Sequence, residues 1–404
     1  MSTVIHQGRL DMTPGEAGFR EAAVERLDAM LQQLICDHRL QGASYLLSKG
    51  CRTFACKAMG SLKYNDPLVP LKSDSIRRVA SLTKWFTLTA VLRLMEEGKL
   101  YLTQPVKDWI PEFDQRAYEQ INVFHLLTHT SGLSPDSGYF LEPYPFGRWE
   151  IEFAYGDEWN EDRPQRSPAE EIEYRKSKWI KAMLAGPPVC SPGEQWDYCS
   201  IGFVLLGEII QRITGMKYEH YIQHTILEPL GMTRTFFTVP EHLHGEVCLT
   251  NEWEEKRLQA EPEPDWAPPR SGGGLYSTLD DLHIFGQMLL NQGTYNGVRI
   301  LSRKSVERLS RAQYPKGLPA FGWGERSKAN KFGLSTYLGK EDEPFKPHTI
   351  YHEGAGRCAL MVDPDEDLIV SFFVPSDVGW VPNRSSMLRI SSGRGYNESN
   401  NERD

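Results

Sequence analysis

A serine and a lysine three residues apart form the first arrangement in this chain that could do covalent chemistry. The tetrapeptide Ser81-Leu82-Thr83-Lys84 opens an apolar segment that predicts a helix from about Ser81 to Glu97. In a helix the third residue on lies one turn away on the same face, so an amine at position 84 can activate a hydroxyl at position 81. Backbone N–H groups at the start of a helix can also bind an oxyanion formed there. The tetrapeptide therefore predicts a serine nucleophile that is activated by a lysine.

The predicted helix gives Lys84 an apolar setting. Its large apolar side chains leave little polar surface, which is typical of a buried helix; they are Trp85, Phe86, Leu88, Val91, Leu92 and Met95. Burying an ammonium group is unfavourable unless the charge has partners or a chemical role. Roughly one Ser-x-x-Lys tetrapeptide is expected by chance in a chain of this length, and this one is the only instance in the sequence. Its apolar context makes Ser81 and Lys84 the leading candidates for chemistry.

A tyrosine in the middle of the chain is the second candidate. Tyr198 lies in the turn segment PGEQWDYCS, residues 192–200, directly before a predicted helix at 200–213. An isolated tyrosine is normally a core side chain. Beside Lys84, however, its phenolate would be favoured by the cation, and it could act as a general base.

The third candidate is the segment YHEGAG, residues 351–356. It is predicted to be a strand that ends in small residues, which indicates a place where the backbone approaches something closely. An ordinary strand end is the simpler alternative.

Taken together and in this order, the three segments resemble the SxxK, SxN and KTG signatures of the serine β-lactamase and penicillin-binding protein superfamily. Tyrosine in the second motif and His-x-Gly in the third are similar to the class C β-lactamase-like branch, which includes family VIII carboxylesterases, D-aminopeptidases and the lovastatin-type acyltransferase. Further similar stretches lie at 125–134, 202–215 and 272–290, so the resemblance spans roughly residues 20–375. It implies an α/β (α+β) fold of the β-lactamase/transpeptidase type, with an antiparallel sheet flanked by helices and a helical lobe.

The resemblance also implies a role for each matching residue. Ser81 would be the acylated nucleophile, Lys84 its activating partner, and Tyr198 the base that later gives a proton to the leaving group. The backbone N–H groups of Ser81 and Ala355 would form the oxyanion hole. No metal or other cofactor is implied.

Four further residues would lie beside the substrate, namely Ser200, His352, Glu353 and Gly354. Two of them depart from the family pattern. Ser200 stands where the family usually has an asparagine, and it offers only a hydroxyl in place of an amide. His352 takes the place of the third-motif lysine; it is largely neutral at pH 7, and Glu353 beside it is negative. We therefore expect an anionic β-lactam to bind poorly.

Sheet-forming segments at both ends of the chain enclose helical ones. A hairpin is predicted from 44–48 and 52–59, and strands at 350–354, 356–363 and 368–374, the last two joined by a turn at 364–367. Further helices are predicted at 20–38, 122–129, 217–227 and 279–291, with a short one from 302. We expect an α/β lobe from residues 1–75 and 262–404, and a helical lobe from 76–261 that carries the first two motifs. The polar tail beyond 382 is expected to fray.

One stretch, residues 136–178, breaks the helical pattern and reads as a long loop. It is rich in prolines, acids and aromatic residues, the latter being Tyr139, Phe140, Tyr144, Phe146, Trp149, Phe153, Tyr155 and Trp159. A solvated insertion and a substrate-covering segment both fit a loop of this length. Exposing so many aromatic side chains would be unfavourable, so we expect the insertion to form a wall of the acyl pocket.

Composition and motif content exclude several other classes of function. The chain has 404 residues and a formal charge of −9, with no Lys/Arg block for nucleic acid or an anionic membrane surface. It also lacks the P-loop, GxGxxG, GxSxG and HExxH motifs.

The pairs His125/His129 and His220/His224 have metal-ligand spacing but no recognisable third ligand, which favours structural roles. Seven cysteines without a CxxC pair indicate reduced thiols. Without a signal-like start or a long apolar run, we expect a cytoplasmic protein whose partner is a small-molecule ester or amide, and the sequence indicates no oligomeric state.

The sequence thus predicts a serine hydrolase that acts through an acyl-enzyme at Ser81, and a carboxylesterase for small esters fits it best. Acyl transfer, D-amino-acid peptidase activity and β-lactamase activity of the same fold are the alternatives within this chemistry. A catalytically weak binding protein is the alternative from another class, and Ser200 in place of asparagine is its main support.

Overall fold

The structure is a computed structural model. The residues it describes are 4–133, 166–184, 187–260, 264–313, 318–322, 325–327, 332–338, 346–355 and 357–375.

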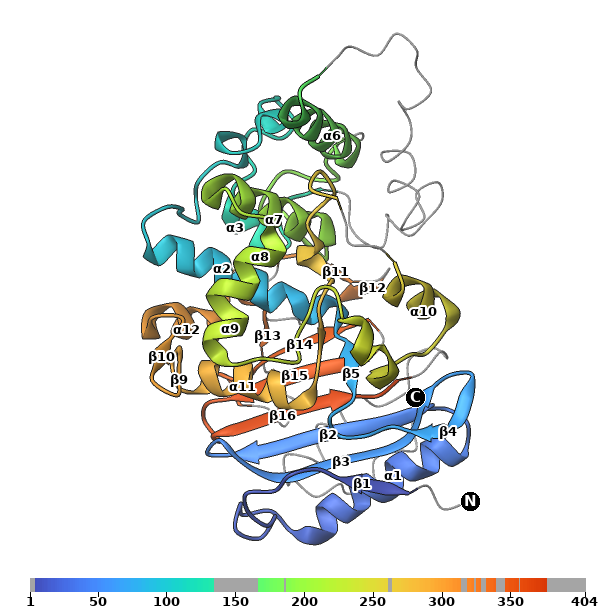
Figure 1. Ribbon diagram of the computed structural model, residues 1–404. Helices are drawn as coiled ribbons and strands as arrows, with labels where there is room; N and C mark the ends of the chain where they lie inside the picture. Colours follow the sequence, from blue (N-terminus) through green and yellow to red (C-terminus); the bar gives the residue numbers. More distant parts are fainter. Residues whose placement is uncertain are drawn as a thin grey trace.

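An antiparallel sheet built from both ends of the chain forms the base of the molecule (Figure 1). Its strand order is β1 (Ile5–Gln7), β3 (Arg52–Lys63), β2 (Gly42–Lys49), β16 (Leu368–Phe373), β15 (Cys358–Asp363), β14 (Ile350–Gly354) and β13 (Tyr337–Leu338), with β4 (Asp66–Pro70) paired to β3. Both predicted hairpins are confirmed, since β2 pairs with β3 and β15 with β16. The pairing of β2 with β16 joins the N-terminal and C-terminal parts, and the sheet with its helices confirms the expected fold class.

Helices cover both faces of this sheet. On one face α1 (Glu21–Cys36) buries Leu27 and Leu31 against Tyr45 and Phe54, with a spacing that its sequence predicted. On the other face α11 (Leu279–Leu290) packs on the sheet so closely that a methyl group at Gly286 would lie 2.9 Å from a side-chain carbon of Ile369. The layer beyond α11 begins with α2 (Thr83–Glu96), where the ring of Phe86 stacks on that of Phe285 with centroids 4.3 Å apart.

Along the chain, most of the remaining helices come between α2 and α11. They are α3 (Val123–Leu127), α6 (Pro168–Met183), α7 (Ser200–Thr214), α8 (Tyr218–Ile222), α9 (Glu228–Leu230), α10 (Glu252–Leu258) and α12 (Arg303–Leu309), with a π-helical turn at Gln223–Leu227. Short 3-10 turns occur at η1 (Ala80–Leu82), Val106–Asp108, Pro111–Phe113, Glu241–Glu246 and η6 (Arg270–Gly272). No helix in the described ranges is both long and apolar enough to cross a bilayer.

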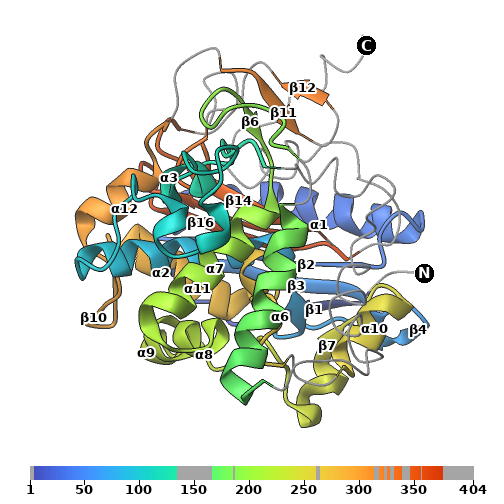
Figure 2. The ribbon, with the colours of Figure 1, turned by 90° about the horizontal axis from the view of Figure 1, so that it is seen from above.

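Within the described residues, three small sheets lie outside the main sheet. One is β7 (Val247–Cys248), β5 (Ile76–Arg78) and β8 (Tyr276–Ser277); another is the ribbon β9 (Thr294–Tyr295) and β10 (Val298–Arg299). The third is β12 (Glu325–Ser327), β11 (Ala320–Gly322) and β6 (Trp196–Asp197). Seen from above, this third sheet lies at one side of the molecule beside α3 (Figure 2). It places the segment around Tyr198 between a short strand and the start of α7.

The prediction of a loop over 136–178 is wrong from residue 168 onward, because α6 begins at Pro168 and runs to Met183. Ser167 caps this helix: its side chain accepts from the N–H of Glu170, and the Glu170 carboxylate accepts from the N–H of Ser167. This Ser-x-x-Glu signal for a helix start lies within a polar, proline-containing stretch, where a loop was predicted. Residues 134–165, with the aromatic side chains named above, and the tail beyond 375 lie outside the described residues.

Candidate active site

Ser81 sits where the chain passes from β5 into α2. The 3-10 turn η1 leads directly into the helix, and Ser81 is half-buried at that junction. Ala80, just before it, has φ +44°, a left-handed conformation that costs a residue with a Cβ about 1–2 kcal/mol. The N–H of Val79 donates to the carbonyl of Leu275 at 2.9 Å, which ties this strained turn to the neighbouring strand segment. The backbone is therefore strained at Ala80, directly before the candidate nucleophile Ser81.

Lys84 is completely buried and points its ammonium at three oxygen atoms. Nζ donates to Ser81 Oγ at 3.1 Å, to Ser200 Oγ at 3.0 Å and to the carbonyl of Gly272 at 2.7 Å. A lysine ammonium carries three N–H donors, so it can bond to several oxygens at once. The interaction that the Ser-x-x-Lys spacing predicted is thus present, and it has the burial that the apolar helix implied.

Tyr198 is brought to the same place from the second motif. It is buried between β6 and α7, and Lys84 Nζ lies 5.0 Å from the centroid of its ring. The ring of Phe203, one turn into α7, lies 5.5 Å from the same ammonium. A cation over the face of an aromatic ring is attracted by the ring electrons, and it also stabilises a phenolate. First and second motifs therefore meet at the lysine.

The carbonyl of Gly272 is a member of this cluster that the sequence motifs did not predict. It belongs to η6, whose Ser271 is held from two sides: its hydroxyl donates to the carbonyl of Phe203, and its carbonyl accepts from Thr87 Oγ1. Three consecutive glycines, residues 272–274, were the available signal for a close backbone approach. The loop thus fastens α2 to α7 and presents a carbonyl to Lys84.

The third motif ends against the turn that carries the serine. A methyl group at Gly354 would lie 2.1 Å from the carbonyl oxygen of Val79, so only glycine fits there. The same carbonyl accepts from Cys358 Sγ at 3.0 Å, from the next strand. Ala355 follows directly after β14 and is exposed. The backbone segments of Ser81 and Ala355, the two expected oxyanion donors, therefore belong to elements that touch.

His352 and Glu353 occupy opposite faces of β14. His352 is buried, with its Nδ1–H donating to the carbonyl of Glu353 at 2.7 Å and its ring edge-on to that of Trp85. Burial, and then the charge of Lys84, lower the pKa of His352 to about 3, so it is neutral at physiological pH. Glu353 alternates with it and shares the other face of the strand with Tyr351, which packs on the α1 side. The structure thus brings His352 near Lys84 and places the Glu353 side chain on the other face.

The histidine pairs with metal-ligand spacing have other contacts. His125 Nδ1 accepts from the N–H of Asn122 at 3.3 Å, and His224 Nδ1 pairs with Glu228 at 2.8 Å. Within the described part of the chain, His, Cys, Asp and Glu side chains form no group of three that could hold a metal ion. His129, for which the spacing favoured a structural role, lies against Tyr198.

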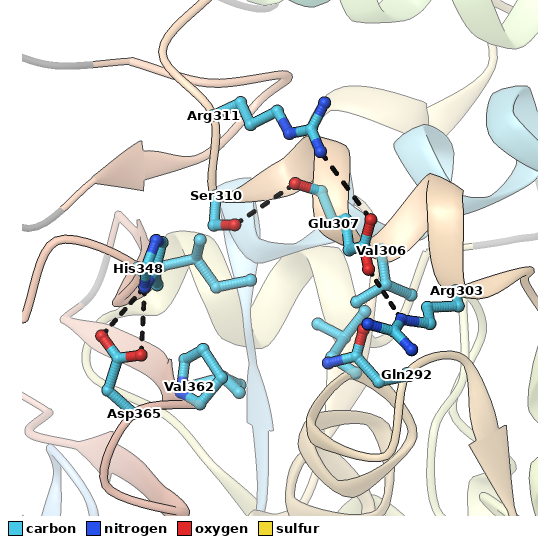
Figure 3. A pocket seen from close by; sticks show the side chains of 12 residues that line it. Gln292, Arg303, Val306, Glu307, Ser310, Arg311, His348, Val362 and Asp365 are labelled. Carbon is cyan, nitrogen blue, oxygen red and sulfur yellow. Dashed lines mark hydrogen bonds and ion pairs between the residues drawn. The ribbon is translucent and has the colours of Figure 1, made fainter.

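A separate cavity of about 480 Å³ lies beside the start of β14, and Figure 3 shows the side chains that line it. It opens between α12, the end of α11, the start of β14 and the turn between β15 and β16. Its polar side chains pair with one another: His348 with Asp365 at 3.0 Å, and Arg303 with Glu307 at 2.7 Å. Gly354, which meets the serine turn, lies at the opposite end of β14 from Ile350, which lines the cavity, so the cavity is separate from the Ser81 cluster.

Comparison with known proteins identifies the family to which the chain belongs. A family model described as beta-lactamase matches residues 23–385. Protein Rv1367c of Mycobacterium tuberculosis is 31% identical over 339 residues, which are 76% of this chain and 79% of the relative. Esterase EstB of Burkholderia gladioli is 31% identical over 282 residues, or 64% of this chain and 67% of the esterase. Among solved structures, "EstCE1, a hydrolase with promiscuous acyltransferase activity" has the same fold, with a TM-score of 0.72 and 17% identity over 93% of this chain and 99% of that one. The chain belongs to the beta-lactamase family, within the serine β-lactamase and penicillin-binding protein superfamily.

Proposed function

We propose that this protein is a serine hydrolase that forms an acyl-enzyme at Ser81 and acts as a carboxylesterase on small esters. One observation carries the proposal: the Lys84 ammonium bonds to Ser81 Oγ at 3.1 Å while it faces the ring of Tyr198 at 5.0 Å. A hydroxyl with a lysine and a phenol beside it has the groups that a serine nucleophile needs for proton transfer.

The reaction would run in two halves. Ser81 Oγ attacks the ester carbonyl carbon and gives its proton to the Lys84–Tyr198 pair, while the backbone N–H groups of Ser81 and Ala355 bind the oxyanion. The bond from the carbonyl carbon to the alkoxy oxygen then breaks, and Tyr198 returns the proton to the leaving alcohol. Water repeats the attack on the acyl-enzyme, releases the acid and restores the Ser81 hydroxyl.

Two features favour neutral esters over anionic β-lactams. His352 is neutral because burial and Lys84 lower its pKa to about 3, so it cannot offer a cation to a substrate carboxylate. Ser200 offers a hydroxyl, already engaged with Lys84, where an amide-binding site would use an asparagine. The similarity to Esterase EstB supports the same choice.

Acyl transfer to an alcohol is the second candidate. It uses the same acyl-enzyme, with an alcohol in place of water in the second half, and the fold is shared with a hydrolase described as having promiscuous acyltransferase activity. Product analysis with a neutral ester and an added alcohol separates the two, because transfer yields a new ester and hydrolysis yields only the acid.

Covalent labelling tests the proposal. Wild-type protein treated with a fluorophosphonate should gain the mass of one phosphonyl group, and Ser81→Ala should gain none while it stays folded. Ser310→Ala, which removes a hydroxyl beside the separate cavity, is the matched control and should label like the wild type. Labelling that persists in Ser81→Ala would refute the assignment, and a wild-type protein that never labels would favour a binding protein of this fold.

A further inference from the structure

A buried histidine lies directly behind Tyr198. His129 is 1% exposed, and the centroid of its ring is 4.4 Å from that of Tyr198. It comes just after α3 with φ +56°, a conformation that is uncommon outside glycine. The ring centroids of Phe203 and Phe332 each lie 5.3 Å from the centroid of the His129 ring. A strained, polar residue is therefore enclosed among aromatic rings beside the candidate base.

His129 holds the chain on both sides of Tyr198. Its backbone carbonyl accepts from the N–H of Asp197 at 2.9 Å. Its side-chain Nδ1 accepts from the N–H of Cys199 at 3.1 Å. Because the residue before Tyr198 and the residue after it are both fixed by one partner, the direction in which the phenol leaves the backbone is fixed too.

The imidazole can keep this role only as a neutral ring. Nδ1 accepts a hydrogen bond when the proton sits on Nε2, so a doubly protonated ring would lose the contact with Cys199. Burial, followed by the charge of Lys84, holds the pKa of His129 well below its usual range. The lowered pKa thus favours the neutral ring, in which Nδ1 can accept from Cys199.

We propose that His129 is a positioning residue for Tyr198, which it holds at Lys84 through the backbone N–H groups of Asp197 and Cys199. This inference rests on the proposed function, in which Tyr198 moves the proton of Ser81. A group displaced by about 1 Å can slow a reaction roughly 10²-fold. Loss of the Nδ1 acceptor should consequently lower kcat and leave KM unchanged, because His129 acts through Tyr198 and does not contact the substrate.

Two amide variants test whether the position of the hydrogen-bond acceptor matters, or only the presence of a polar side chain. In His129→Asn the side-chain oxygen falls at the position of Nδ1, and asparagine also tolerates positive φ. In His129→Gln the amide lies one bond farther out. Rates with a p-nitrophenyl ester are divided by the fraction of sites that a fluorophosphonate titrates, so that unfolded protein does not count. We expect the Asn variant to stay near wild-type kcat and the Gln variant to fall roughly 10²-fold with KM unchanged.

A nearby histidine supplies the matched control. His125 Nδ1 also accepts a backbone N–H, that of Asn122, in the first turn of α3. His125→Gln should lower the melting temperature without changing kcat. Equal kcat losses in the two His129 variants, or no loss in either, would overturn the inference. If the Gln variant does not fold, His129→Leu, which also lacks the acceptor, takes its place with the same expectation.

The inference and the proposed function fail in different ways. Tyr198→Phe should slow fluorophosphonate labelling of Ser81 by itself, and adding His129→Gln should then slow it no further, because both changes act on one step. Wild-type labelling by Tyr198→Phe would refute the role of Tyr198. A slow Tyr198→Phe that becomes much slower with His129→Gln would leave the proposed function intact and refute the positioning role.

Discussion

At the scale of single residues, Lys84 is where the motifs converge. Its contact with Ser81 follows from helical spacing, and its position over the Tyr198 ring follows from how α7 is placed. A lysine and a tyrosine that move the same proton should not contribute independently. This expectation can be measured with single and double variants.

Lys84→Ala and Tyr198→Phe should each lower kcat/KM roughly 10²–10⁴-fold, as loss of general acid–base catalysis does. The kcat/KM of the double variant should be no lower than that of the less active single variant, because both changes abolish the same proton transfer. Tyr218→Phe removes another buried hydroxyl, one that bonds to Thr87 at 2.8 Å, and should keep near wild-type turnover. Losses of the two single variants that multiply in the double variant would show that Lys84 and Tyr198 act in separate steps.

The charge state of His352 makes a second residue-scale prediction. Because its pKa is lowered to about 3, the imidazole stays neutral from pH 8 to pH 5. The ratio of kcat/KM for a neutral ester to that for an anionic ester of the same alcohol should therefore not change over this range. Steady-state rates at pH 8 and pH 5 measure it. A marked gain of the anionic ester below pH 6 would mean that a histidine with an ordinary pKa faces the substrate.

At the scale of elements, the site depends on how closely α7 approaches η6. A methyl group at Gly207 would lie 2.3 Å from Ser271 Oγ, so Gly207→Ala should push η6, and with it the carbonyl of Gly272, away from Lys84. We expect a large loss of esterase activity. Gly202→Ala on the same helix meets only ordinary contacts of 3.4 Å or more and should keep its activity. Equal activities of the two variants would show that the Gly272 carbonyl is dispensable.

Sequence patterns predicted those elements whose signals are local. Helix periodicity located α1, α2, α7 and α11, and strand patterns located both hairpins of the main sheet. The start of α6 was missed because its capping residues lie in a polar stretch without apolar periodicity. The contacts of Gly272 and His129 were missed because they join segments far apart in the chain, and no local pattern records such pairings. The family motifs predicted which residues form the site, whereas their hydrogen-bond partners became apparent only in the structure.

At the scale of the whole molecule, buried histidines couple stability to pH. His283, on α11, bonds to Ser48 of β2 at 2.7 Å, and burial lowers its pKa to about 4. Between its unfolded pKa of about 6.5 and its folded pKa, the unfolded chain binds a proton that the folded protein does not, so the free energy of unfolding falls as the pH falls. His283→Gln should make this decline shallower by up to about 1.4 kcal/mol per pH unit. Urea unfolding at pH 7, 6 and 5 checks it, and equal slopes for variant and wild type would contradict it.

The most direct test of the central claim is the location of the acyl group. Protein mixed with a p-nitrophenyl ester, quenched in acid during turnover and digested, should carry the acyl mass on the peptide that contains Ser81. Ser200 is the informative competitor, because its hydroxyl also bonds to Lys84, at 3.0 Å. An acyl group on Ser81 alone is the result that this structure predicts. An acyl group on Ser200, or turnover with neither serine modified, would contradict it.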